Sequence, residues 1–143
     1  MSNSSLSDLP GNIRLVPEAV NEFLKLDHHE QILVFGGMKK IARDPVHIGK
    51  WLGNRGKGKD QKRLVNFKTV RIDKSNLRIV WTVPKDGRDY IEVAIVTGIG
   101  PRSEKEVYQQ VAGRLQSISE FQRALLDLYK NSLTVDKQTG KDR

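Results

Sequence analysis

Three strand-like runs joined by short turns limit the fold more than any other feature of this sequence. They lie at about residues 63–72, 77–83 and 90–97, and the segments DKSN and PKDGRD separate them. Both separators contain residues that favour hairpin turns. Consecutive strands joined by such short connections pair antiparallel. The sequence therefore predicts a three-stranded antiparallel meander in the middle of the chain.

The segment before the meander predicts a short strand and two helices. The run IRLV at residues 13–16 is a candidate first strand, and Pro17 opens a helix with apolar residues at helical spacing. Asp27, followed three residues later by Glu30, predicts a capping box at the start of a second helix that ends at RDPV. These two helices are expected to form a hairpin.

Two more helices are expected after the meander. Ser103 with Glu106 predicts a capping box for the first, and Ser117 with Glu120 predicts another for the second. The apolar stripe from Phe121 to Tyr129 along the last helix is most simply core packing, although it could also dock an antitoxin or a second copy of the chain. The final residues, from SLTVDK onward, are expected to form a frayed tail.

These elements predict one α+β domain. With 143 residues, 37% of them hydrophobic, the chain has enough apolar side chains for one modest core. The expected architecture is an antiparallel sheet, made of the short N-terminal strand and the meander, packed on the helix hairpin. Residues 1–12 are expected to be a flexible leader, 13–116 the domain, and 117–143 an extra helix with its tail.

Composition excludes several classes of protein. The chain has no cysteine, so it has neither a disulfide framework nor a thiolate metal site. Its opening residues lack the pattern of a signal peptide, and its apolar runs are too short to span a bilayer. A cytoplasmic protein without a membrane partner is expected. The histidines lack ligand partners at metal-binding spacing, and no cofactor is expected.

The positive charge of the chain is concentrated in one segment. The net charge is +8, and the segment from Gly49 to Arg78 holds ten basic and two acidic residues, while the remainder holds fifteen of each. Such clustering is typical of proteins that bind a phosphate-rich partner, although a solvated lysine-rich loop is the simpler alternative. We interpret it as a nucleic-acid interface, in which Lys57, Lys59, Lys62 and Lys68 contact phosphates.

The alternation of residues along the strands places two arginines together. Val70 and Ile72 share one face of their strand, so Arg71 lies on the other, and the same alternation sends Arg78 away from the core face of the next strand. Both guanidinium groups are therefore expected on the same face of the sheet. The near match to a phosphate-binding loop at Gly53–Lys59 is weaker, because Asp60 replaces the required Ser or Thr.

The order of elements and three motifs resemble the RelE/ParE toxin superfamily, specifically its RelE-like branch of ribosome-dependent mRNA interferases. The motifs are KKIARDP with GKWL, FKTVRIDKSNLRIVW, and GPRSEKEVY, and the resemblance covers about residues 13–116. By this resemblance, the catalytic residues are Arg71, Arg78, Arg102 and Tyr108. Where the family usually has a catalytic lysine this chain has Thr69, and Lys68 beside it is expected to point to the opposite face.

The resemblance also implies an activity and partners. The protein would be the toxin of a type II toxin–antitoxin system, a metal-independent endoribonuclease that cuts mRNA on the ribosome. Its partners would be mRNA, the ribosome and a cognate antitoxin, with operator DNA bound only through the antitoxin complex. Non-catalytic alternatives are a ParE-like gyrase inhibitor and a repurposed RNA-binding module.

The candidate residues suit metal-free RNA cleavage. Guanidinium groups are planar, permanently charged and bidentate toward phosphate oxygens, so they can stabilise the charge that develops at the scissile phosphate. A tyrosine near them could act as a base, as a proton relay or as a stacking platform. The alternative is that Tyr108 only packs and that Arg102 only caps the preceding strand.

Overall fold

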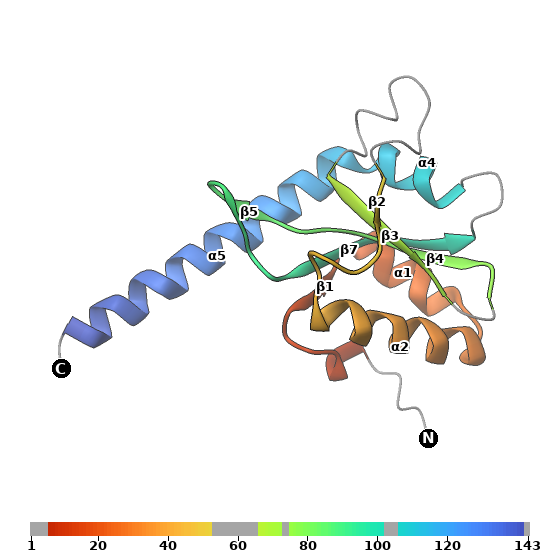
Figure 1. Cartoon of the computed structure of the whole chain (residues 1–143), viewed down its shortest axis with the longest axis horizontal. Coiled ribbons are helices and arrows are strands. Elements are labelled where there is room, and N and C mark those ends of the chain that lie inside the picture. The colour runs from red at the N-terminus through yellow and green to blue at the C-terminus, as the bar shows by residue number, and fades with distance from the viewer. Residues whose placement is uncertain (1–5, 53–65, 73–74, 102–105, 142–143) are drawn as a thin grey trace.

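The computed structural model describes residues 6–52, 66–72, 75–101 and 106–141 (Figure 1). A short 3-10 helix (Leu6–Asp8) precedes strand β1 (Ile13–Leu15) and helices α1 (Pro17–Lys25) and α2 (His28–Arg43). The strands that follow are β2 (Lys50–Trp51), β3 (Phe67–Arg71), β4 (Leu77–Thr82), β5 (Lys85–Asp86), β6 (Asp89–Tyr90) and β7 (Ala94–Pro101). Helices α4 (Glu106–Gly113) and α5 (Leu115–Lys141) complete the described chain.

A five-stranded sheet forms the centre of the domain, in the order β1-β7-β4-β3-β2. Strand β4 pairs antiparallel with both β3 and β7, so the predicted meander is confirmed. At one edge β1 pairs parallel with β7, and at the other β2 pairs antiparallel with β3. Strands β5 and β6 form a separate two-stranded hairpin. The predicted α+β class is confirmed.

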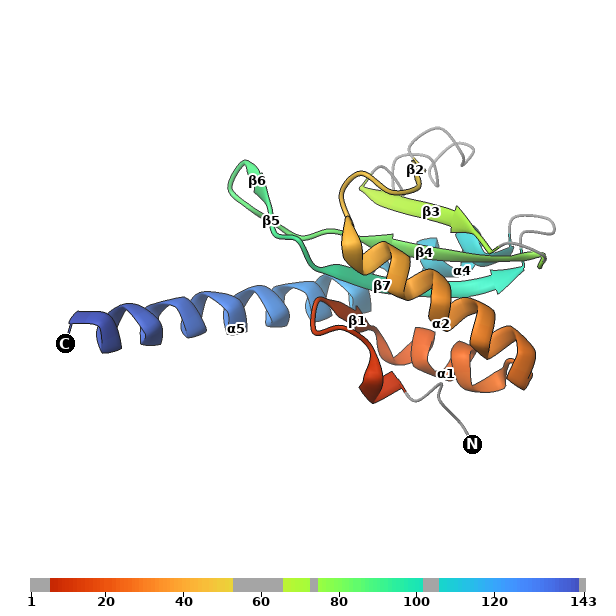
Figure 2. The ribbon, with the colours of Figure 1, turned by 60° about the horizontal axis from the view of Figure 1, so that its bottom comes forward.

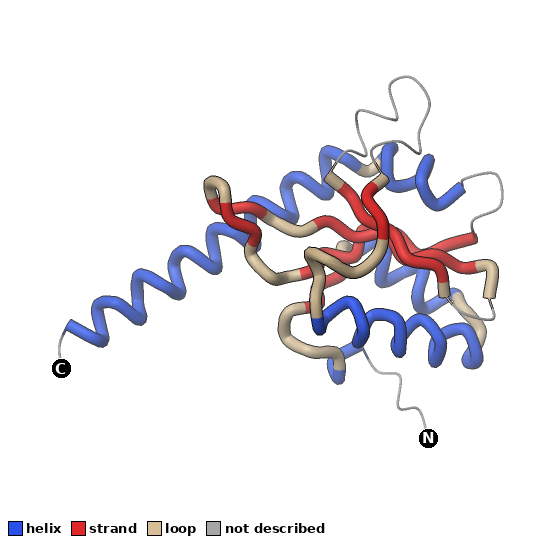
Figure 3. The backbone as a smooth tube through the Cα atoms, viewed as in Figure 1, coloured by secondary structure: helices blue, strands red, loops and turns tan. Residues whose placement is uncertain are grey.

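Helices cover both faces of the sheet (Figures 2 and 3). The hairpin of α1 and α2 lies on one face, where α2 comes so close that a Cβ on Gly37 would lie 2.7 Å from Cδ1 of Ile72. Helix α4 lies on the other face, where a Cβ on Gly98 of β7 would lie 2.6 Å from Cγ2 of Val111. Only glycine permits so close an approach at Gly98.

The core therefore has two layers. Trp81, Ile79 and Phe23 are buried on the side of the helix hairpin. Val80 and Thr82, which strand alternation predicted to point away from the core, are also buried, because α4 and the start of α5 cover their face. The sheet is therefore buried on both sides at its centre.

Local signals at the helix starts were confirmed in one case and wrong in another. The capping box of α2 is present: Oδ1 of Asp27 accepts a hydrogen bond from the Glu30 backbone N–H at 2.8 Å, and the Asp27 N–H donates to Oε1 of Glu30. The box predicted at Ser117 is wrong. Helix α5 begins two residues earlier, and the Ser117 hydroxyl donates to Oε2 of Glu18 at 2.9 Å.

The two ends of the described chain correspond to the predicted leader and tail. Leu6 and Leu9, in the segment expected to be a flexible leader, pack against the core. Helix α5 continues to Lys141 through the segment expected to fray, and it projects away from the body of the protein (Figure 1). None of the helices in the described part of the chain is long and apolar enough to cross a membrane.

Candidate nucleic-acid interface

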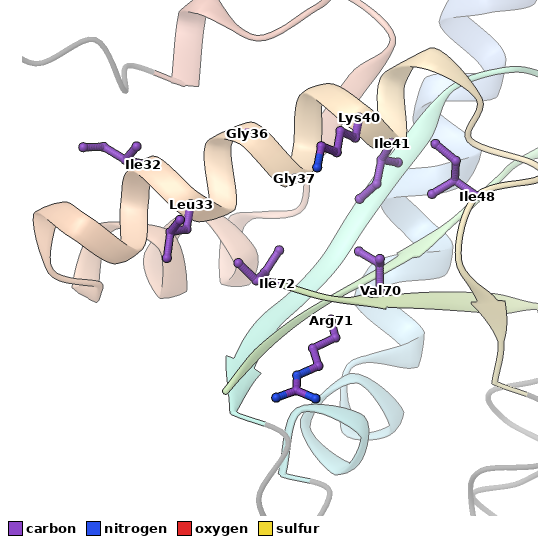
Figure 4. A pocket seen from close by; sticks show the side chains of 10 residues that line it. All are labelled: Ile32, Leu33, Gly36, Gly37, Lys40, Ile41, Ile48, Val70, Arg71 and Ile72. Atoms are coloured by element: carbon purple, nitrogen blue, oxygen red, sulfur yellow. The ribbon is translucent and has the colours of Figure 1, made fainter. Parts of the chain in front are cut away.

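Two arginines lie directly opposite each other on neighbouring strands. Arg71, the last residue of β3, is the cross-strand partner of Arg78 on β4. Side chains of directly paired residues project from the same face of a sheet. Figure 4 shows that Arg71 points to the opposite side of β3 from Val70 and Ile72. The structure thus brings the two arginines together as the sequence predicted, on a surface that we call the arginine face.

Helix α4 borders the arginine face. Arg78 pairs with Gly100 of β7, and a Cβ on Gly100 would lie 3.5 Å from Cβ of Val107 at the start of α4. Since Arg78 and Gly100 share a face, the Arg78 side chain projects on the side of the sheet that α4 covers. The arginine face is therefore a corner between the sheet and a helix.

Among the described residues, the guanidinium group of Arg78 has few partners and the side chain of Arg71 is exposed. Arg78 is half-buried, and its Nε is a buried nitrogen without a hydrogen-bond partner in the described part of the chain. Neither arginine forms an ion pair with any described carboxylate. Like charges placed directly opposite each other destabilise a sheet, and a buried donor without a partner adds a further cost. An anion bound between the two side chains would offset both costs.

Tyr108 lies on α4 but not on an exposed rim. Its side chain is 6% exposed and belongs to the hydrophobic core, together with Val107 and Val111 of the same helix. The roles of base, proton relay or stacking platform require access to the RNA, which this burial limits. Its helix lies on the side of the sheet from which the arginines project, so its catalytic role remains a prediction.

Lys68 points away from the arginine face, as strand alternation predicted. It is 2% exposed, its Nζ donates a hydrogen bond to the carbonyl of Val46, and it lies 4.5 Å from the centre of the Trp51 ring. Burial lowers the pKa of this ammonium group, and the carboxylate of Asp44 partly offsets the effect. This position argues against the predicted contact of Lys68 with RNA. The residue instead fastens the connection between α2 and β2 to the sheet.

Thr69 occupies the position on β3 between Lys68 and Val70 where the resemblance leads one to expect a lysine. It shares a face with Arg71, but its side chain is buried, and its hydroxyl donates a hydrogen bond to the Ile79 carbonyl at 3.1 Å. A hydroxyl held in this way stabilises the β3–β4 pair. It is poorly suited to accept a proton from substrate.

Several predicted site residues lie outside the described residues: Arg102, Lys57, Lys59 and Lys62, together with the capping serine Ser103. Their assignments remain predictions. Among the described residues, no group of His, Asp or Glu side chains is arranged to hold a metal ion.

An ion pair that the sequence did not predict joins helix α1, strand β7 and the junction of α4 with α5. Arg114, between α4 and α5, donates to both carboxylate oxygens of Glu22 on α1, at 2.9 and 2.8 Å. Arg114 also donates to the Thr97 carbonyl, while the same Glu22 carboxylate accepts from the Ile99 backbone N–H at 3.1 Å. Hydrogen bonding to Glu22 raises the pKa of Arg114. We call this arrangement the Glu22–Arg114 clamp.

The clamp blocks a free strand edge. Strand β1 pairs with β7 from Ala94 to Val96, and no other described strand pairs with β7 on that side. A β-bulge at Thr97, where Val80 pairs with Gly98 and the next residue of β4 pairs with Val96, changes which backbone groups face outward. The clamp binds the Thr97 carbonyl and the Ile99 N–H, two groups that an added strand would otherwise bind.

A mostly apolar groove of about 390 Å³ lies between α2 and the end of β3 (Figure 4). Lys40 and Arg71 are also among its lining residues, although the Arg71 side chain points away from Val70 and Ile72. Ile32, Leu33, Ile41, Val70 and Ile72 line most of it. Ile32 is 49% exposed. The groove therefore offers apolar contacts and no grouping of catalytic side chains.

Comparison with known proteins gives distant structural likeness. No protein-family model and no curated protein matches the chain. The crystal structure of the isolated E. coli RelE toxin superposes with a TM-score of 0.47 and 19% sequence identity, covering 72% of this chain and 96% of that one. A likeness this distant does not assign a function, so the proposal below depends on the residues of this chain.

Proposed function

We propose that this protein binds RNA through the arginine face and cleaves it without a metal ion, as a ribosome-dependent mRNA endonuclease toxin that a cognate antitoxin holds inactive. The paired Arg71 and Arg78, with the unsatisfied Nε of Arg78, are the observation that carries the proposal. The concentration of positive charge between Gly49 and Arg78 and the sequence resemblance of GPRSEKEVY to mRNA interferases give further support.

The chemistry assigned to these residues follows from what RNA cleavage requires. The 2′-hydroxyl attacks the adjacent phosphorus, and negative charge accumulates on the phosphate oxygens before the 5′-oxygen departs. Arg71 and Arg78, together with Arg102 of the GPRSEKEVY motif, would stabilise that charge. The products would be a 2′,3′-cyclic phosphate and a 5′-hydroxyl. Tyr108 would relay a proton or stack against a base.

The proposal can be tested with translating ribosomes and a defined mRNA, mapping the RNA ends that form. The wild-type protein should produce cuts in register with the codons, and Arg78→Ala should reduce the single-turnover rate on the order of a hundredfold. Arg88→Ala is a matched control, because Arg88 is an exposed arginine in the β5–β6 turn. This substitution removes the same charge from the hairpin that follows β4. The variant should cleave RNA at the wild-type rate.

The outcome also separates the alternatives. Intact mRNA together with inhibition of DNA gyrase would favour a ParE-like inhibitor. RNA binding without cleavage, lost equally in Arg71→Ala and Arg78→Ala, would favour a repurposed RNA-binding module. Equal cleavage by Arg78→Ala and the wild-type protein would remove the arginine face from the catalytic site.

A further inference from the structure

Helix α5 carries an apolar stripe that is packed against the core at its start and exposed farther along the helix. Near the start of the helix Ile118 is buried and Leu125 is half-buried against the core. Leu128 and Tyr129 continue the same side of the helix but are 64% and 41% exposed. Positions three and four residues apart share a helical face, so these exposed side chains continue the packed face toward the part of α5 that projects from the domain. Figure 1 shows the course of that helix.

A groove lies beside this stripe. It has a volume of about 260 Å³ and is mostly apolar, lined by Pro84, Ile91 and Val93 from the domain and by Leu125, Leu128 and Tyr129 from α5. Leu128 and Tyr129 line the groove and yet remain exposed, so the groove is open on their side. One surface therefore presents both projecting apolar side chains and an unfilled apolar groove.

We propose that this surface is the interface of a homodimer, in which two α5 helices pack about a two-fold axis near Leu128 and the stripe of each chain enters the groove of the other. A two-fold interface uses the same patch on both copies, so the patch must be complementary to itself. A patch that holds both a projection and a matching cavity meets this requirement. This inference goes beyond the proposed function and does not depend on it.

Charge also favours a second copy over a polyanionic partner. The chain as a whole carries a charge of +8, which would oppose self-association, but that excess lies between Gly49 and Arg78. Arg14 is the charged residue that lines the groove, and the Lys130 ammonium of α5 forms an ion pair with the Asp86 carboxylate of β5 at 3.6 Å. Because the excess charge of the chain lies elsewhere, two such patches can approach each other without strong repulsion.

The length of the helix is sufficient for such a contact. From Leu125 to Lys141 the helix extends for about 24 Å at 1.5 Å per residue. An antiparallel partner could therefore lie along several turns of it. The groove is bordered by Pro84, after the end of β4, whereas the arginine face is at the beginning of β4. Dimerisation would leave both arginine faces open.

The test compares two leucines of equal exposure on different helices of the full-length protein. Leu128→Glu places a charge in the proposed interface, and Leu24→Glu places the same charge on α1, where Leu24 is 63% exposed. Sedimentation velocity over a wide concentration range should show dimers for the wild-type protein and for Leu24→Glu. It should show monomers for Leu128→Glu, with unchanged circular dichroism.

A cross-linking experiment tests the position of the axis. The chain has no cysteine, so a single introduced thiol can form a disulfide only with another copy. Under mild oxidation Leu128→Cys should give a covalent dimer much faster than Leu24→Cys. A wild-type protein that stays monomeric at every concentration would overturn the proposal, as would equal behaviour of the Leu128 and Leu24 variants in both experiments.

Discussion

The role proposed for Arg71 and Arg78 would have a cost in stability for the free protein. Each occupies a strand position where an uncharged residue would fit, and together they place two positive charges side by side. Functional sites often contain such locally unfavourable arrangements, because the ligand supplies the missing partner. At this site the ligand that would restore the balance is an anion.

The first prediction is that Arg71→Gln stabilises the free protein while weakening its function. Removing one of two opposed like charges should raise the free energy of unfolding by about 0.2–1 kcal/mol at low salt. Urea denaturation measures this gain, and the gain should shrink at high salt because the repulsion is screened. RNA affinity of the same variant should fall. A variant that is less stable than the wild-type protein at low salt would show that Arg71 has a structural partner.

The second prediction separates the hydroxyl of Tyr108 from its ring. Because Tyr108 is 6% exposed in the core, Tyr108→Phe should keep its packing and its melting temperature, whereas Tyr108→Ala should lose about 3–5 kcal/mol of stability. If the hydroxyl transfers a proton, Tyr108→Phe will lower the single-turnover cleavage rate with normal ribosome binding. Arg102→Ala, removing a donor to the developing charge, should also lower the rate more than it lowers binding. Normal rates in both variants would remove both residues from the catalytic site.

At the scale of elements, the sequence was most informative where the pattern was local. The meander of β3, β4 and β7 was predictable because alternation and turn residues are read within a few positions. The parallel pairing of β1 with β7 was not, because the residues that it joins are about 80 positions apart. The burial of Val80 was missed for a related reason: the covering of a strand face by α4 is not visible in the strand itself.

In the candidate site, too, the sequence predicted what depends on local pattern and missed contacts between residues far apart in the chain. Strand alternation correctly placed Arg71 opposite Arg78 and sent Lys68 to the other face. It could not show that Lys68 would be buried, since the carbonyl that binds its ammonium group belongs to Val46, 22 residues earlier. The Glu22–Arg114 clamp joins residues 92 positions apart, so it could not be predicted from a local sequence motif.

The third prediction concerns this clamp as the link between α1, β7 and the α4–α5 junction. Glu22→Ala leaves Arg114 largely buried without its partner and frees the Ile99 N–H, so it should lower the free energy of unfolding by about 2–3 kcal/mol. Glu18→Ala is the matched control, because Glu18 lies on the same helix and accepts a single hydrogen bond from Ser117. Glu18→Ala should lower the free energy of unfolding much less than Glu22→Ala does. Adding Arg114→Met to Glu22→Ala should recover part of the loss, which thermal or urea unfolding would detect.

The fourth prediction concerns the lysine-rich segment before β3. Lys57, Lys59 and Lys62 lie outside the described residues, and their role is inferred from charge alone. If each contacts one phosphate of single-stranded RNA, changing all three to alanine should flatten the slope of log affinity against log salt by about 2. Cleavage at saturating protein should survive, because phosphate contacts of this kind position the RNA and do not perform the reaction. An unchanged salt slope would remove the segment from the binding surface.

At the scale of the whole molecule, the two proposed surfaces lie at opposite ends of β4. The arginine face is at its start, and the groove beside α5 is bordered by Pro84 just after its end. The seven residues from Arg78 to Pro84 span about 20 Å in extended conformation. This separation exceeds the range within which substitutions usually couple, so RNA cleavage and dimerisation should respond to different residues.

The fifth prediction tests that independence with a double-variant comparison. Leu128→Glu should abolish the dimer and leave the cleavage rate per chain unchanged, while Arg78→Ala should lower the rate on the order of a hundredfold and leave the dimer intact. The variant with both changes should show the two losses together, without any further effect on either measurement. Sedimentation velocity and single-turnover cleavage on the same preparations provide both readings. Faster cleavage by Leu128→Glu would mean that the dimer covers the arginine face, and slower cleavage would mean that α5 of one chain contributes to the site of the other. Either result would show that the two ends of the molecule are coupled, contrary to their separation along β4.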